Sequence, residues 1–277
     1  IAISAFVATI IAWASTLLPA EWTSTPWHPL LACALFIVPG VPLINFVDDM
    51  LDNYIQVGIV RAVNTLLMVA AMAFGIAFAV KLCRIENFFP TISMVPHHQY
   101  WEYAIAAAIS AMGFSMIFNI QRRLLWVVAI GGIIAVCTRN FVNLGPSTDN
   151  IGLDMGLVIG SFSGAVLVSL IAIKAVHWFH VPNHVLTIPS VIPMIPGVLM
   201  YRMLFGIINI NVQSIDQVTP LMKAIESGVN SGLVIMCIAL GVAIPNIFGR
   251  RFIASSKNKR LAELLKERKA RGKFVEW

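Results

Sequence analysis

The chain has 277 residues, of which 58% are hydrophobic and only 12% are charged. With a mean hydropathy of +0.84, this composition excludes an ordinary soluble domain and indicates an integral membrane protein. The net charge of +6 does not predict a nucleic-acid partner, because ten of the nineteen Lys and Arg residues lie between Arg250 and Lys273. The four cysteines stand singly, a pattern typical of packing residues rather than of a disulfide or metal site.

Apolar stretches long enough to cross a bilayer core of about 30 Å recur along the chain. Their length favours helices over barrel strands. We therefore predict an all-α polytopic fold with about eight membrane spans, near 1–18, 28–47, 57–80, 102–119, 124–142, 153–177, 185–210 and 223–247. The run from Ile1 lacks the basic flank of a signal peptide, so we interpret the chain as a fragment of a longer protein.

The basic segment after the last span predicts the topology. Cytoplasmic loops carry an excess of Lys and Arg, so the C-terminus is predicted to be cytoplasmic, and counting back through eight spans places Ile1 there too. The predicted outer loops at 145–154 and 211–219 contain no Lys or Arg, in agreement, whereas Lys81 and Arg84 disagree. The tail is predicted to contact anionic membrane lipid, although a specific binding helix is the alternative.

Two of the predicted spans are interrupted by proline and glycine. The second span contains "FIVPGVPLINFVDDM", with Pro39 and Gly40 near its centre. The seventh contains "VIPMIPGVLMYR", with Pro193, Pro196 and Gly197. Proline removes an amide donor and clashes with the preceding turn, so both helices are predicted to kink or open at these points.

The helices that follow the two breaks also match. Asn64 precedes Gly75 by eleven residues, and Asn230 precedes Gly241 by the same interval. Five spans separate the copies, an odd number, so we predict an inverted repeat. Matched broken helices of this kind point to the midplane site of a secondary transporter, where unwound backbone meets a polar substrate. The alternative is that Pro and Gly are simply common in membrane helices.

The segments "IPMIPGVLMYRMLFG" and "GFSMIFNIQRRLLWVVAIGG" resemble the C-terminal five-helix domain of the threonine/serine exporter family, and "VPGVPLINFVDDMLDNYIQVGIVRAVNTLLMVAAMAFGIAFA" resembles the end of its N-terminal domain. The resemblance implies proton-motive-force-driven efflux of a small carboxylate-bearing metabolite across the plasma (inner) membrane, without a cofactor. Threonine and serine are the implied substrates, with succinate as the alternative.

On this resemblance the chain divides into four parts: the last three helices of a truncated N-terminal exporter domain (1–82), an extracellular linker (83–101), the C-terminal five-helix domain (102–248) and a basic cytoplasmic tail (249–277). The predicted substrate-binding residues gather around the breaks and in the two helices after them. They are Pro39, Gly40, Asn45, Asn64, Pro193, Pro196, Gly197, Tyr201, Arg202 and Asn230.

Among these residues, Arg202 lies about 7.5 Å along the helix from Gly197. Its guanidinium could hold a carboxylate or form a gating pair, and snorkelling to the interface is the alternative. Asn64 and Asn230 could instead be interhelical hydrogen-bonding groups. Asp48 and Asp49 are proposed carriers of the coupling proton, with a solvated acidic cap as the alternative.

Three further patterns have structural explanations. Gly156, Gly160 and Gly164 follow at four-residue intervals, which predicts close helix packing within the bundle or in a homo-oligomer. His177, His180 and His184 have a helical metal-ligand spacing, but Pro182 interrupts it, so no metal site is predicted. No nucleophile–base pair, acid pair or metal set of an intramembrane enzyme is recognisable, and a non-transporting scaffold remains the third possibility.

Overall fold

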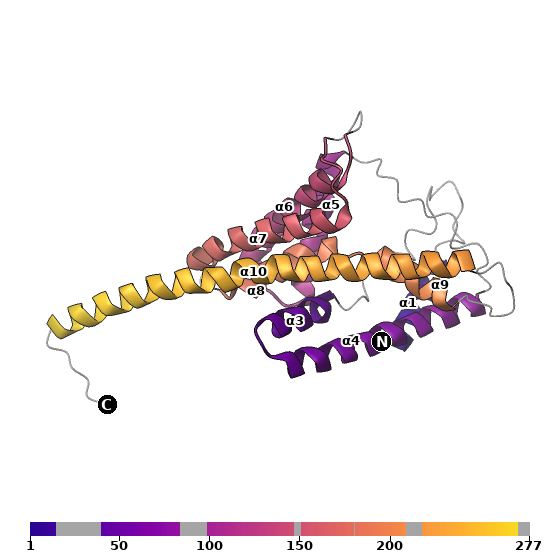
Figure 1. Ribbon diagram of the computed structural model, residues 1–277, viewed down its shortest axis with the longest axis horizontal. Helices are drawn as coiled ribbons and strands as arrows, with labels where there is room; N and C mark the ends of the chain where they lie inside the picture. The colour runs from indigo at the N-terminus through magenta and orange to yellow at the C-terminus, as the bar shows by residue number, and fades with distance from the viewer. Residues whose placement is uncertain (15–39, 84–98, 147–150, 180, 209–217, 271–277) are drawn as a thin grey trace.

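The computed structural model describes residues 1–14, 40–83, 99–146, 151–179, 181–208 and 218–270. Every regular element in these residues is a helix, which confirms the predicted all-α class. The longest helix is α10 (Val218–Ala270), with 53 residues and Pro245 in its interior. It runs along the length of the molecule, and its C-terminal part projects beyond the other helices (Figure 1).

Ten further elements complete the described fold. They are α1 (Ala2–Ala14), α3 (Gly40–Leu51), α4 (Ile55–Leu82), α5 (Tyr100–Ile117), the short 3-10 turn η2 (Arg122–Leu124), α6 (Leu125–Asn143), α7 (Leu157–Phe179), α8 (Asn183–Val191), the 3-10 turn η3 (Ile192–Met194) and α9 (Gly197–Ile208).

Four helical segments in the described residues are long and apolar enough to cross a membrane: Ile55–Leu82, Arg122–Asn143, Leu157–Val176 and Leu221–Gly249. They coincide with the predicted third, fifth, sixth and eighth spans, and they make the chain an integral membrane protein. The predicted fourth span forms the 18-residue helix α5. The predicted seventh span is divided into α8, η3 and α9. The total of eight spans stays a prediction, because 15–39 lie outside the described residues.

Glycine lets four helices pack with almost touching backbones. A Cβ atom added to Gly132 of α6 would lie 3.0 Å from the Ala107 carbonyl oxygen of α5. One added to Gly241 of α10 would lie 2.9 Å from the Phe162 carbonyl oxygen of α7. Small residues give membrane helices this close approach, which supplies packing where burial from water cannot. Helices α5, α6, α7 and α10 therefore pack side by side, and small residues lie at the contacts between neighbouring helices.

The predicted three-glycine face of α7 needs a correction. Gly156 has φ +88° and precedes α7, which begins at Leu157, so it does not belong to the helical face. The chain before it instead hydrogen-bonds to the end of α6, with the Met155 amide donating to the Val142 carbonyl. Gly160 and Gly164 pack against α6 backbone within the chain. A homo-oligomer through these glycines stays a prediction.

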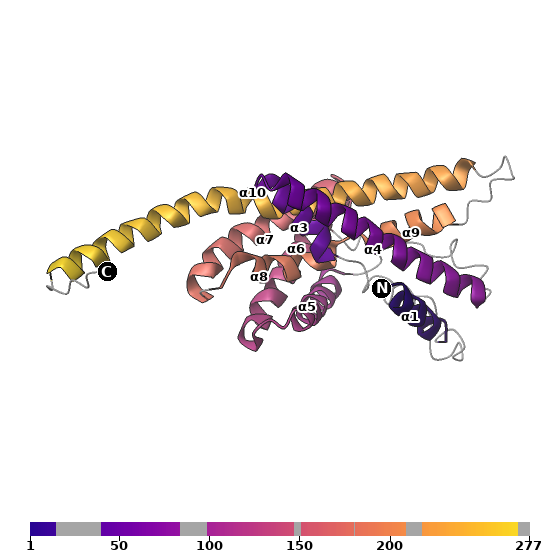
Figure 2. The same cartoon turned by 90° about the horizontal axis from the view of Figure 1, so that it is seen from below.

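The N-terminal helices form the other side of the molecule. Helix α3 folds back on α4, and a Cβ atom on Gly58 of α4 would lie 3.0 Å from the Phe46 carbonyl oxygen of α3. Helix α9 lies between α4 and α10, and α1 covers another face of α4 (Figure 2). A core of small and branched side chains from α3, α5, α6, α7, α8, η3 and α10 joins the two sides, and Ile44, Met194 and Ile238 are among its largest fully buried side chains.

Candidate functional site

The seventh predicted span breaks between Ile192 and Gly197. Helix α8 ends at Val191 and passes into the 3-10 turn η3, which contains Pro193. Ile195 then adopts an extended conformation, with ψ 128°, before the helix resumes at Gly197. Two prolines separated by two residues cannot continue an α-helical hydrogen-bond ladder, which explains the position of the break. The predicted opening of this helix is confirmed.

The second predicted span is described from Gly40 onward. Helix α3 begins at Gly40, the glycine of its "PGV" sequence, as α9 begins at the matching Gly197. Pro39 and the residues before it lie outside the described part of the chain. Helix α9 starts after the extended residue Ile195, so no helical turn directly precedes its first residues, and the Gly197 amide donates to the Ile195 carbonyl.

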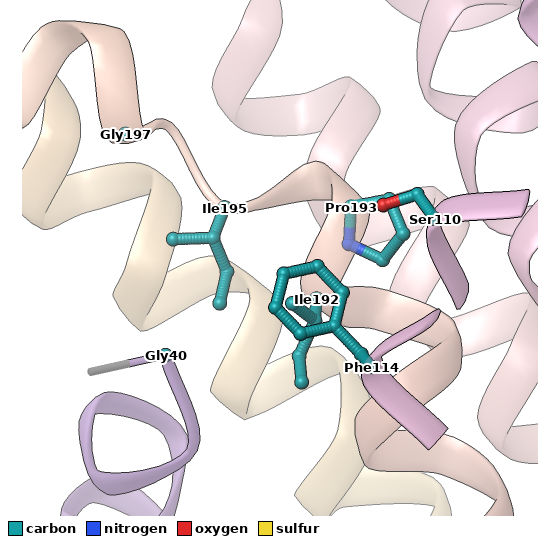
Figure 3. A pocket seen from close by; sticks show the side chains of 7 residues that line it. All are labelled: Gly40, Ser110, Phe114, Ile192, Pro193, Ile195 and Gly197. Atoms are coloured by element: carbon teal, nitrogen blue, oxygen red, sulfur yellow. The ribbon is translucent and has the colours of Figure 1, made fainter. Parts of the chain in front are cut away.

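Gly40 and Gly197 line one small cavity. It has a volume of about 130 Å³ and is lined by Gly40, Ser110, Phe114, Ile192, Pro193, Ile195 and Gly197. Figure 3 shows Ile195 between the two glycines, with Ser110 and Phe114 of α5 on the opposite side. A Cβ atom on Gly40 would lie 2.5 Å from the Cδ1 methyl of Ile195. The geometry thus brings together three of the predicted residues, Gly40, Pro193 and Gly197.

Most polar groups that this cavity could present to a substrate belong to the backbone. Among its lining residues, Ser110 has the only polar side chain, and the other side chains are apolar. The cavity is therefore polar only through Ser110 and through backbone groups near the helix ends. Its volume is below the roughly 300 Å³ of typical small-molecule pockets, so the described conformation leaves room for a small molecule only.

Two family models match the chain in sequence order. The model described as "Putative threonine/serine exporter" matches residues 1–83, and the model described as "Threonine/Serine exporter, ThrE" matches residues 103–248, more than half of the chain. The chain belongs to the threonine/serine exporter family. No solved structure matches it. Membership supports a transporter rather than an enzyme, and the exporter is an integral membrane protein.

The exporter places two further predicted residues at equivalent positions. Asn45 lies five residues after Gly40, and Arg202 lies five residues after Gly197. Both are half-buried, and neither lines the cavity in the described conformation. Pro196 is half-buried in the break itself, and Tyr201 belongs to α9. Their part in substrate binding stays a prediction.

Asn64 and Asn230, the matched asparagines of the exporter, lie away from the cavity. Asn64 is exposed on α4, and Asn230 is exposed on α10. Within the described residues, neither side chain hydrogen-bonds to another helix. The buried positions of the two motifs are the glycines, Gly75 and Gly241.

The acidic end of α3 contacts two other elements. Asp49 accepts a hydrogen bond from Arg61 of α4 at 2.5 Å, and Asp48 lies 3.9 Å from His184 Nε2 of α8. The side chains of Asp48 and Asp49 retain 19% and 21% exposure, so they are neither fully buried nor free in water. This contact joins the first broken helix of the exporter to the second.

Sequence reasoning missed the side of the cavity that α5 supplies. Ser110 and Phe114 lie in an ordinary-looking apolar stretch, without a proline or charge to mark it. The spacing of His184 with two other histidines gives no sign of its contact with Asp48. No group of three metal-ligating side chains occurs in the described ranges. His180, one of the other two histidines, lies outside those ranges.

Proposed function

We propose that this exporter is a secondary transporter that moves threonine and serine out of the cytoplasm, driven by the proton motive force. The observation that carries the proposal is that Gly40 and Gly197, the glycines of the two "PGV" sequences, line one cavity in a chain of the exporter family. Broken helices at matching positions are the usual construction of a transporter's central site.

The start of α9 at the cavity suits a carboxylate. The N-terminus of a helix carries a partial positive charge and amides without intrahelical partners, and it therefore attracts anions. Gly40 and Gly197 are the first residues of α3 and α9 and both line the cavity. The Gly197 amide donates to the Ile195 carbonyl, so in the proposed mechanism the substrate carboxylate is held by later amides in the first turn of α9, and Arg202 binds it or closes a gate as the cavity widens.

An inverted repeat is part of the proposal, and helix pairing supports it. Helix α1 packs against α4, and α7 packs against α10. In each pair the matched glycine makes the contact: a Cβ atom on Gly75 would overlap the Ala2 carbonyl oxygen, and one on Gly241 would lie 2.9 Å from that of Phe162. The first and third predicted spans thus pair as the sixth and eighth do.

In the proposed topology both ends of this chain are cytoplasmic in the plasma (inner) membrane, with the 83–101 linker and the 145–154 loop outside. A single cysteine at position 147, in Ser147→Cys, tests it in a background without Cys33, Cys83, Cys137 and Cys237. An impermeant maleimide added to intact cells is expected to label it. Labelling from the cytoplasmic side alone would contradict the inverted arrangement.

Proton coupling is assigned in this proposal to Asp48 and Asp49, the carboxylates at the end of α3. Carboxylates near a membrane pathway are costly and commonly mark proton relays. The contacts with Arg61 and His184 support a role in which charge at this point affects how α3 sits against α4 and α8.

The function is tested by efflux of labelled threonine, serine and succinate from cells that carry or lack the intact protein. Faster efflux of threonine and serine, abolished by a protonophore, is expected. Efflux of succinate alone would assign the dicarboxylate alternative. Equal efflux of all three with and without the protein would overturn transport and favour a scaffold role.

A further inference from the structure

A buried amide pair joins α8 to α10 at the beginning of α8. Asn183 Nδ2 donates a hydrogen bond to Asn246 Oδ1. Asn246 is only 6% exposed and follows Pro245 in the interior of α10. The other two polar atoms of the pair, Asn183 Oδ1 and Asn246 Nδ2, are buried without a hydrogen-bond partner in the described structure. The pair thus presents one unused acceptor and one unused donor.

Buried polar atoms of this kind normally have a hydrogen-bond partner. Nearly all buried polar atoms in folded proteins bond to protein, water or a bound molecule, and an unpaired one destabilises the fold. If the two asparagines only linked α8 to α10, a reciprocal amide pair with two hydrogen bonds would satisfy all four atoms. Here one hydrogen bond is made, and an acceptor and a donor are left over.

We propose that Asn183 and Asn246 form a recognition site for a zwitterionic amino acid on the cytoplasmic side of the central cavity. Asn246 Nδ2 donates to the substrate carboxylate, and Asn183 Oδ1 accepts from its ammonium group. This inference rests on the proposed function, since it identifies where the exported amino acid is selected.

The start of α8 adds a second attraction for the carboxylate. Asn183 is the first residue of this nine-residue helix, and no side-chain hydrogen bond caps it. Uncapped amides and the positive end of the helix dipole favour an anion at this point. The carboxylate bound by Asn246 would therefore lie where the helix terminus also stabilises negative charge.

Two further polar side chains, Thr187 and Ser190, lie on α8 between this site and the residues of the cavity. Thr187 and Ser190 follow Asn183 at intervals of four and three residues, which places all three on one face of α8. Thr187 is 0% and Ser190 is 2% exposed, and both bond to backbone carbonyls. Pro193, at the cavity, is ten residues beyond Asn183, or about 15 Å at helical rise. Ser190 also donates to the Val128 carbonyl of α6, and α8 spans the distance between the proposed site and the cavity.

The site distinguishes substrate classes by hydrogen-bond type. An amino acid offers a carboxylate that accepts and an ammonium group that donates, so it satisfies both unused atoms. A dicarboxylate offers acceptors only at neutral pH, so Asn183 Oδ1 would stay unpaired. A site that leaves a buried polar atom unpaired rejects the ligand concerned strongly. The pair therefore favours threonine and serine over succinate.

The test compares efflux of labelled threonine with that of labelled 3-hydroxybutyrate, which is threonine without its ammonium group, from cells that contain the intact protein. In Asn183→Leu the threonine preference should fall about tenfold or more, as expected for a lost hydrogen bond to a charged group. In Asn246→Asp the half-saturating threonine concentration should rise by a similar factor, because a carboxylate then faces a carboxylate.

Ser169→Ala is the matched control, because it removes a buried hydrogen bond from α7 to the Val242 carbonyl of α10, one turn from Asn246. Its threonine preference should equal that of the parent protein. Asn183→Ser serves if the leucine variant does not reach the membrane. Normal threonine efflux with an unchanged preference in the variants would overturn this inference and leave the proposed function intact. Absence of threonine and serine efflux from the parent protein would overturn both.

Discussion

The two Pro-Gly breaks share a sequence and differ in what packs around them. At the first, α3 extends from Gly40 and folds back on α4 through Gly58. At the second, the short helix α8 before the break is described, and its last six residues, Leu186 to Val191, are all buried. Helix α8 packs against α6, α7 and η3. The comparison teaches that a repeated backbone device can carry different surroundings, and that buried polar groups gather beside the second.

The residues five positions beyond each break allow the sharpest test of the comparison. Arg202→Gln should reduce efflux about a hundredfold, as expected for loss of a charge-assisted contact with the carboxylate. Arg202→Lys, which keeps the charge but loses the planar fork, should restore only part of it. Efflux is measured at matched membrane abundance. Asn45→Ala, which removes no charge at the equivalent position, should reduce efflux less than Arg202→Gln. Near-normal efflux in the Gln variant would remove Arg202 from the site.

The matched glycines come next in size. Gly241→Val should destabilise the purified protein by about 1–3 kcal/mol, because the added side chain meets the Phe162 carbonyl oxygen and Ala165. Thermal unfolding in detergent measures the effect. Gly232→Ala in the same helix is the control, since nothing lies within 4 Å of its added Cβ atom. It should be neutral or stabilising by up to about 1 kcal/mol.

A smaller effect is expected at the first restart. Gly40→Ala pushes the Cδ1 methyl of Ile195 aside, into the cavity, and should slow efflux several-fold with little loss of stability. Ile195→Val lacks that methyl and should restore efflux when combined with Gly40→Ala. If the double variant is as slow as the single one, the two breaks do not share a functional cavity.

The smallest effect is expected at the charged end of α3. Asp49→Asn removes the contact with Arg61, whose side chain is 49% exposed, so the free energy of unfolding should fall by no more than about 1 kcal/mol. Asp48→Asn combined with Asp49→Asn addresses coupling, and the pH dependence of threonine efflux should flatten. An unchanged pH profile in the double variant would show that both are solvated caps.

Much of the fold could be predicted because its cause is local. Apolar length predicts the four membrane-crossing helices, and Pro193 with Pro196 predicts a break wherever they stand in a helix. Gly156 was misassigned because spacing alone does not reveal its positive φ. The Asn183–Asn246 pair could not be predicted, since 62 intervening residues separate its members and only the packing of α8 on α10 brings them together. Ser110 could not be predicted as a cavity residue either, because only the packing of α5 against η3 brings it there.

The length of α10 has a mechanical consequence. At 1.5 Å per residue, its 53 residues measure about 80 Å, far more than a bilayer core. Pro245 removes one backbone hydrogen bond in the interior of this rod, so bending concentrates there. The 25 residues beyond it form an arm of about 37 Å, and a tilt of about 10° at this fulcrum moves the far end by about 6 Å. A force on the basic tail would therefore bend α10 at the turn that contains Asn246.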